Sequence, residues 1–155
     1  IDIPEIYQGY AFLGSRKVER NREYLFTSSD RFDEVFDMKR AIKNKKFKYI
    51  RNYYVDQPHA IDNTYRKQMN LMNHLIQLNE ANLLNESQSI WFKVPKKREE
   101  FYDLENDPFE LKNLISNASY SNEIKVMREE LDRWMEKIND LGMIPEKNLI
   151  DIVTN

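Results

Sequence analysis

Cysteine is absent from these 155 residues, which excludes disulfide bridges, thiolate metal sites and cysteine nucleophiles within them. Only three glycines are present, and this scarcity argues against a glycine-rich phosphate-binding fold. No apolar run approaches the roughly 20 residues that a membrane-spanning helix needs. Neither sign of charge dominates, because 24 basic residues stand against 26 acidic ones. The sequence therefore predicts neither a nucleic-acid partner nor a membrane partner.

Apolar residues make up 41% of the chain and aromatic residues 12%, enough to build one hydrophobic core. We predict a single domain over residues 1–155 with an α+β fold. Alternating patterns near residues 23–29, 37–43, 47–53 and 100–104 predict a small antiparallel sheet of about four strands. Residues 121–138 predict an amphipathic C-terminal helix that packs against this sheet; its apolar face comprises Ile124, Met127, Leu131, Trp134 and Ile138.

Two further segments give weaker patterns. Between residues 64 and 80, Tyr65, Met69, Met72 and Ile76 recur at three- and four-residue steps, which predicts one amphipathic helix. The stretch "SIWFKV" at residues 89–94 is interpreted as a short strand or extended segment that stops before a proline. In the turn after the fourth predicted strand, Leu111 and Leu114 are expected to return to the same core.

The segment "FYDLENDPFELKNLI" closely resembles the signature "ELYDLxxDPxExxNLA" near the C-terminus of type I sulfatases, which are members of the alkaline-phosphatase-like superfamily. The matching residues are Tyr102, Asp103, Leu104, Asp107, Pro108, Glu110, Asn113 and Leu114. Three other stretches match in the same order along the chain. They are "IPEIYQGYAFLG", "SDRFDEVFDMKRAIKNKKFKYIRNY" and "DLGMIPE".

This resemblance implies that the chain is a C-terminal sulfatase subdomain whose N-terminal catalytic domain is missing. In the family, a formylglycine made from the motif C/S-x-P-x-R attacks the sulfate ester beside a calcium ion. Neither this motif nor a carboxylate cluster with the spacing of that metal site occurs here. The chain alone is therefore expected to be inactive and to wall the substrate cleft of a parent that hydrolyses a sulfated glycan or an aryl sulfate. The resemblance also implies a periplasmic or secreted enzyme.

The charged stretch "SDRFDEVFDMKR" is the best candidate for substrate contacts, because it carries seven charged residues between positions 30 and 40. We expect it to form a loop in which Arg31 and Arg40 bind a sulfate or a carboxylate while Asp30 and Asp33 accept hydrogen bonds from sugar hydroxyls. The alternative is internal ion pairing that holds the chain against its missing partner domain. His59 follows a proline after the third predicted strand and is a further substrate-binding candidate. No residue is predicted to be catalytic or to bind a metal.

Other functions remain open at this point. The parent could be a phosphonate or phosphodiester hydrolase of the same superfamily, or the chain could be a free-standing carbohydrate-binding module. The stretch "KNKKFKYIRNYY" alternates basic and aromatic residues, as single-strand nucleic-acid binders do, but a half-buried strand explains it better. If the surface that meets the catalytic domain is exposed, the chain could form a dimer through it.

Overall fold

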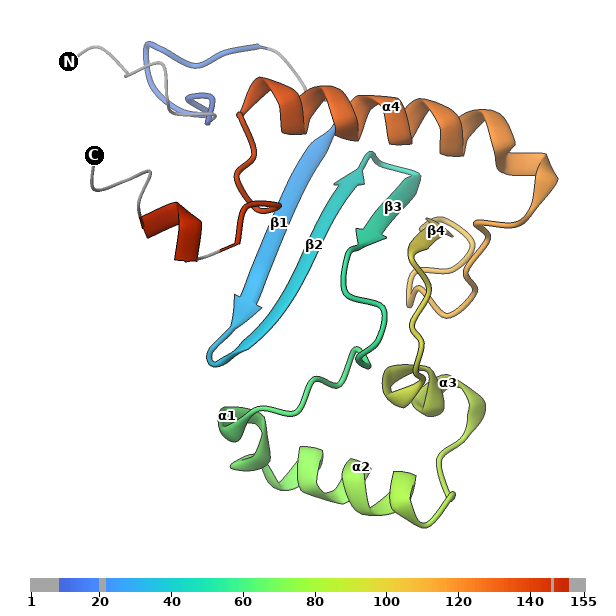
Figure 1. The fold of residues 1–155 in the computed structure, drawn as a ribbon. Helices are drawn as coiled ribbons and strands as arrows, with labels where there is room; N and C mark the ends of the chain where they lie inside the picture. Colours follow the sequence, from blue (N-terminus) through green and yellow to red (C-terminus); the bar gives the residue numbers. More distant parts are fainter. Residues whose placement is uncertain (1–8, 20–21, 146, 151–155) are drawn as a thin grey trace.

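The computed structural model describes residues 9–19, 22–145 and 147–150. Four antiparallel strands form one sheet in the order of the sequence: β1 (Leu25–Phe32), β2 (Val35–Lys43), β3 (Phe47–Asn52) and β4 (Glu99–Asp103). The long helix α4 (Ser121–Lys137) lies along one end of this sheet (Figure 1). The predicted α+β fold, its four strands and its C-terminal helix are confirmed.

The sheet has two faces of different character, because successive side chains of a strand point to opposite sides. Ile42 of β2 and Tyr49 of β3 pair across the strands, and both are fully buried on the face that packs against α4. Their neighbours alternate to the other face, where Lys39 of β2 pairs with Asn52 of β3. The α4 side is therefore mainly apolar, and the opposite side carries charged and polar groups.

The hydrophobic core lies between α4 and the sheet. Ile124, Met127 and Leu131 of α4 pack against the apolar sheet face and are at most 5% exposed. Trp134 stacks on Phe26 of β1 with a ring separation of 4.9 Å, which extends the contact to the edge strand. Burial of these side chains contributes on the order of 1.5–3 kcal/mol each. The helix face that the sequence predicts is the one that packs.

The predicted helix over residues 64–80 is wrong in one respect, because the chain forms two helices instead. These are α1 (Thr64–Lys67) and α2 (Asn70–Glu80), and Met69 between them has an extended backbone. The Asn73 side chain donates a hydrogen bond to the carbonyl of Lys67, which satisfies the end of α1 locally. Met72 is the buried residue of α2, whereas Tyr65 is 56% exposed.

The first four residues of the segment "SIWFKV" are helical, so the prediction of a strand or extended segment is wrong for them, whereas Lys93 after them has an extended backbone. The four helical residues belong to α3 (Glu86–Ser89) and the 3₁₀ helix η1 (Ile90–Phe92). Asn85 and Gln88 exchange side-chain and backbone hydrogen bonds, and this capping box starts the helical turn. A second 3₁₀ helix, η2 (Ala118–Tyr120), precedes α4. Among the described residues, no helix combines the length and apolarity that crossing a bilayer requires.

Several signature residues stabilise the turn after β4. The Asp103 carboxylate accepts hydrogen bonds from the backbone of Glu105 and Asn106, and Asn113 accepts one from the Phe101 N–H. Leu114 is 9% exposed and joins the core as predicted, but Leu111 is 50% exposed. The expectation that both leucines anchor this turn is therefore correct for Leu114 alone.

Candidate functional site

The charged stretch of residues 29–40 forms a β-hairpin and not the loop that the sequence predicts. β1 continues to Phe32, and Phe32 pairs directly with Val35 at the start of β2. Asp33 occupies the tight turn with φ of 48°, in the left-handed region that aspartate tolerates better than most residues. The neighbouring Glu34 accepts hydrogen bonds from the N–H and hydroxyl of Thr64, which attaches the hairpin tip to α1.

Arg40 is buried on the α4 side of the sheet and is 2% exposed. Its Nε and Nη2 donate to the two carboxylate oxygens of Asp140, at 2.5 Å and 2.8 Å. Nη1 donates to the carbonyls of Ser29 and Lys39, and Nη2 also lies 2.8 Å from Asp30 Oδ1 as an ion pair. This geometry favours internal ion pairing for Arg40, the alternative to direct substrate binding.

The residues after α4 fit closely around this guanidinium. Hydrogen bonds from Arg40 outweigh burial and hold the pKa of the Asp140 carboxyl below its usual range. Asp140 also accepts a hydrogen bond from the Gly142 N–H. A Cβ at position 142 would lie 2.1 Å from Arg40 Nη2 and 2.9 Å from Asp30 Oδ1. The "DLG" of the matching segment "DLGMIPE" therefore has a structural reason, because the aspartate binds the arginine and the glycine leaves room for it.

A cavity of about 450 Å³ opens beside this ion pair. One wall comes from the hairpin and the other from the segment that follows α4. Its lining residues are Ser28, Asp30, Arg31, Phe36, Arg40, Ile138, Asn139, Asp140, Leu141, Gly142, Ile144 and Leu149. Three of the five predicted substrate-binding residues, Asp30, Arg31 and Arg40, meet here. Asp33 at the hairpin tip and His59 do not line it.

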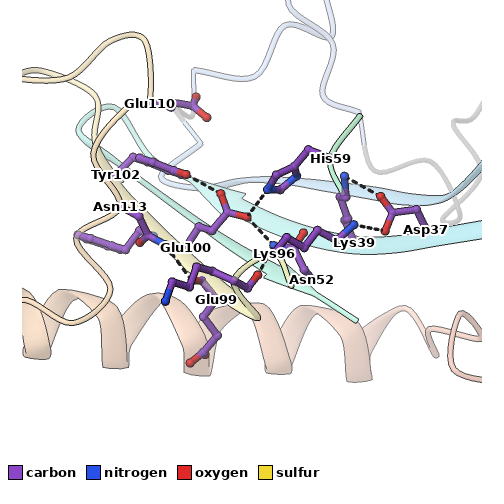
Figure 2. A network of polar contacts seen from close by, with 12 residues as sticks. Asp37, Lys39, Asn52, His59, Lys96, Glu99, Glu100, Tyr102, Glu110 and Asn113 are labelled. Atoms are coloured by element: carbon purple, nitrogen blue, oxygen red, sulfur yellow. Dashed lines mark hydrogen bonds and ion pairs between the residues drawn. The ribbon is translucent and has the colours of Figure 1, made fainter. Parts of the chain in front are cut away.

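His59 belongs to a second cluster, on the opposite face of the sheet (Figure 2). We call this cluster the buried polar network; it comprises Asp37, Lys39, Asn52, His59, Lys96, Glu100 and Tyr102. Its two carboxylates, those of Asp37 and Glu100, form ion pairs and hydrogen bonds with side chains from several segments. Asp37 lies 2.5 Å from Lys96 Nζ and 2.8 Å from Lys39 Nζ.

Glu100 is the second acid of the buried polar network. Its carboxylate accepts hydrogen bonds of 2.5 Å from both Asn52 and the Tyr102 hydroxyl, and His59 Nε2 lies 3.5 Å away. Glu100 is 6% exposed and Asn52 is fully buried. Asn52 Oδ1 has no hydrogen-bond partner among the described residues, although the Asn52 amide group donates to Lys97 O and Glu100.

Burial sets the protonation states in this network. It lowers the pKa of His59 despite the nearby Glu100, so the imidazole is neutral at pH 7. It also lowers the pKa of Lys96 and raises that of Tyr102, and the bond to Glu100 raises the latter further. Burial alone would raise the pKa of Asp37, but hydrogen bonds from Lys39 and Lys96 keep it below its usual range.

The network and the cavity lie on opposite faces of one sheet, so the structure does not assemble the five predicted residues into one site. Sequence reasoning missed Glu100 as the partner of His59, and it missed Lys96 and Tyr102 as members of the same network. The alternation of strand residues places Glu100 and Tyr102 on one face, and the same alternation in β2 places Asp37 and Lys39 there. In the described part of the chain, no group of three histidine, aspartate or glutamate side chains could hold a metal ion.

Known proteins resemble this chain over nearly its whole length. No family model matches. An ulvan-active sulfatase of Formosa agariphila is 43% identical over 151 residues, which cover 97% of this chain and 25% of the relative. A second ulvan-active sulfatase of the same bacterium is 29% identical over 162 residues, covering 96% of this chain and 28% of the relative. The chain thus spans about a quarter of the length of these curated relatives.

Solved sulfatases share the fold. The 2-O GAG sulfatase BT1596 superposes with a TM-score of 0.55 and 19% identity, covering 91% of this chain and 22% of that one. BT4656, solved with its substrate D-glucosamine-2-N,6-O-disulfate, gives the same TM-score with 17% identity, covering 94% of this chain and 23% of that one. The comparison of sequences and the comparison of structures agree, because the matches in each are to sulfatases. The chain is therefore similar in sequence to about a quarter of the length of these sulfatases, and it shares its fold with part of the solved ones.

Proposed function

We propose that this chain forms the C-terminal part of an enzyme that hydrolyses sulfate esters of a sulfated carbohydrate, and that it walls the substrate cleft. The observation that carries this proposal is the 43% identity to an ulvan-active sulfatase across 97% of the chain. A binding role is supported by the cavity, whose wall carries the charged side chains of Asp30 and Arg31. The catalytic groups of the parent would belong to the three quarters of the relatives' length that this chain does not span.

Within that role, the exposed charged residues of the cavity and the buried ones would have different functions. Arg31 is exposed at the cavity wall and would bind the anionic group of the substrate, with Asp30 beside it as a hydrogen-bond acceptor. Arg40 is buried in its pair with Asp140 and would position the hairpin without touching substrate. Asp33 at the tip and His59 in the buried polar network remain candidates for contacts outside the cavity.

The family resemblance supports further parts of the proposal. The parent would bind calcium and carry the formylglycine in the part that precedes this chain, and it would act in the periplasm or outside the cell. These groups supply the nucleophile and its electrostatic activation when present. The residues described here would bind and orient the sugar and exclude water from one side of the cleft.

The whole protein is expected to release inorganic sulfate from ulvan, with sulfate measured by ion chromatography. A variant of the C/S-x-P-x-R nucleophile to alanine is the control for background hydrolysis. The phosphonate or phosphodiester alternative is tested in parallel with an aryl phosphodiester and an aryl phosphonate. Release of the phenol from the aryl phosphodiester or the aryl phosphonate ester, without any release of sulfate from ulvan or from an aryl sulfate, would overturn the proposal.

A further inference from the structure

Three exposed aromatic rings lie near one arginine at the end of the molecule that contains the hairpin tip; two of them flank the guanidinium, and the third contacts one of these two rings. Phe32 ends β1, Tyr65 and Arg66 lie in α1, and Trp91 lies in η1. These four residues, which we call the aromatic–arginine cluster, come from three segments far apart in the sequence. α1 lies next to the tip of the β1–β2 hairpin (Figure 1).

The guanidinium of Arg66 lies close to two of the three rings. The Cζ atom of Arg66 lies 5.0 Å from the ring centroid of Phe32 and 5.8 Å from that of Trp91. The rings of Phe32 and Tyr65 are 6.1 Å apart and tilted by 60°. The exposed fractions are 38% for Phe32, 56% for Tyr65 and 47% for Trp91, so the rings are not used up in core packing.

Hydrogen bonds hold the segments of the cluster in register. The Asn63 side chain, in a residue 2% exposed, accepts from the Arg66 N–H at 2.9 Å and donates to Phe32 O at 3.5 Å. The Ala60 N–H donates to Trp91 O at 2.8 Å. Such fixed support reduces the entropy that the rings would lose on binding a ligand.

The charge of the cluster is positive. Arg66 Nη1 donates to the carbonyl of His59, and among the described residues its guanidinium has no carboxylate partner. By contrast, the neighbouring Lys67 is paired with Asp62 at 2.5 Å. A cavity of about 280 Å³ opens beside Arg66; its charged lining residues are Asp62, Arg66, Lys67 and Glu80, and the three rings of the cluster lie outside it. A cation flanked by exposed rings fits a ligand that has both an apolar face and a negative group.

We propose that the aromatic–arginine cluster is a subsite for an anionic sugar residue of the polysaccharide substrate, remote from the bond that is cleaved. The C–H face of the sugar would lie on an aromatic ring, and its carboxylate or sulfate would accept hydrogen bonds from Arg66. The substrate class rests on the proposed function. The cavity of Asp30 and Arg31 lies elsewhere and shares no lining residue with this cluster.

The test is affinity electrophoresis of the whole protein in gels that contain ulvan, because retardation reports binding whether or not sulfate is released. Trp91→Ala and Tyr65→Ala are each expected to weaken binding by about tenfold. Phe109→Ala is the matched control, since Phe109 is 81% exposed and lies outside the cluster; it should bind like the wild type. Arg66→Lys keeps the charge but loses the planar fork, and it should also weaken binding.

Further gels identify the group that binds. Dextran sulfate carries sulfate alone, polygalacturonate carries carboxylate alone, and dextran carries neither. Retardation by at least one of the charged polymers and none by dextran is expected, and the stronger of the two identifies the anion. Wild-type binding by both Trp91→Ala and Tyr65→Ala would overturn the subsite, as would equal loss in Phe109→Ala. Melting curves confirm folding of each variant, and Tyr65→Ala decides the matter if Trp91→Ala does not fold.

Discussion

Replacement of Asp140 by asparagine is expected to lower the free energy of unfolding by about 3 to 5 kcal/mol, because it removes the buried one of the two carboxylates that pair with the Arg40 guanidinium. The Asp140 side chain is 7% exposed, so water has little access to solvate the Arg40 guanidinium once the carboxylate is removed. Asp30 remains near Arg40, but it lies in a side chain that is 46% exposed. Urea unfolding of the purified chain, followed by circular dichroism, measures the loss.

The matched control is Asp132→Asn. Asp132 lies 2.5 Å from Arg51, but its side chain is 55% exposed, so its loss should cost about 1 kcal/mol or less. Equal effects of the two substitutions would contradict the assignment of Arg40 and Asp140 as a buried structural pair. A wild-type value for Asp140→Asn would contradict it more directly.

This pair also gives the chain a specific dependence on pH. Since Arg40 lowers the pKa of Asp140 in the folded state, the carboxylate contributes stability above its unfolded pKa of about 3.9. That contribution is lost as pH falls below this value and through the lower pKa of the folded state. The difference in stability between wild type and Asp140→Asn should therefore shrink in acid. Urea midpoints at pH 7 and pH 3 measure it, and an unchanged difference would be inconsistent with the pair.

Asp37→Asn is expected to have an effect of the same size, about 3 to 5 kcal/mol. Asp37 is 4% exposed and is the anion between Lys39 and Lys96, whose side chain is 1% exposed. Without it, two lysines face each other across an asparagine, and Lys96 must stay charged without a partner or lose its proton. The free energy of unfolding from urea titration gives the magnitude.

A double-mutant cycle separates the interaction from other effects of the substitution. Lys96→Met removes the buried charge, so the double variant Asp37→Asn with Lys96→Met should recover much of the stability lost in Asp37→Asn. The exposed pair of Asp62 and Lys67 is the control, and Asp62→Asn should cost less than about 1 kcal/mol. Strictly additive effects of the two network substitutions would show that Asp37 and Lys96 do not interact.

The elements with a regular apolar period could be predicted from the sequence. The face of α4 with Ile124, Met127 and Leu131 repeats at helical spacing, and the packing follows the pattern. The segment of residues 64–80 shows the same spacing but forms two helices, because Asn73 satisfies the end of α1 and Tyr65 stays exposed. Periodicity alone does not reveal such a local polar cap.

The candidate site could be predicted only in part, because its contacts join distant segments. The charges of residues 30–40 point to a functional or ion-paired hairpin, but the pairing of Arg40 with Asp140 spans 100 residues. The contact between His59 and Glu100 likewise joins two segments that are distant in the sequence. Nothing local in the sequence distinguishes the buried arginine from its exposed neighbour Arg31, and burial decides which of them can meet a ligand.

The proposed role of this chain as a wall of the substrate pocket is tested most directly by the proposed activity, with the kinetics of sulfate release measured for the whole protein carrying Arg31→Ala. Arg31 is exposed at the cavity, so its loss should raise KM for ulvan by about tenfold with little change in kcat. Lys45→Ala, in the exposed turn between β2 and β3, should leave both constants unchanged. A KM for Arg31→Ala equal to that of the wild type, in a protein with the same melting temperature, would contradict that role.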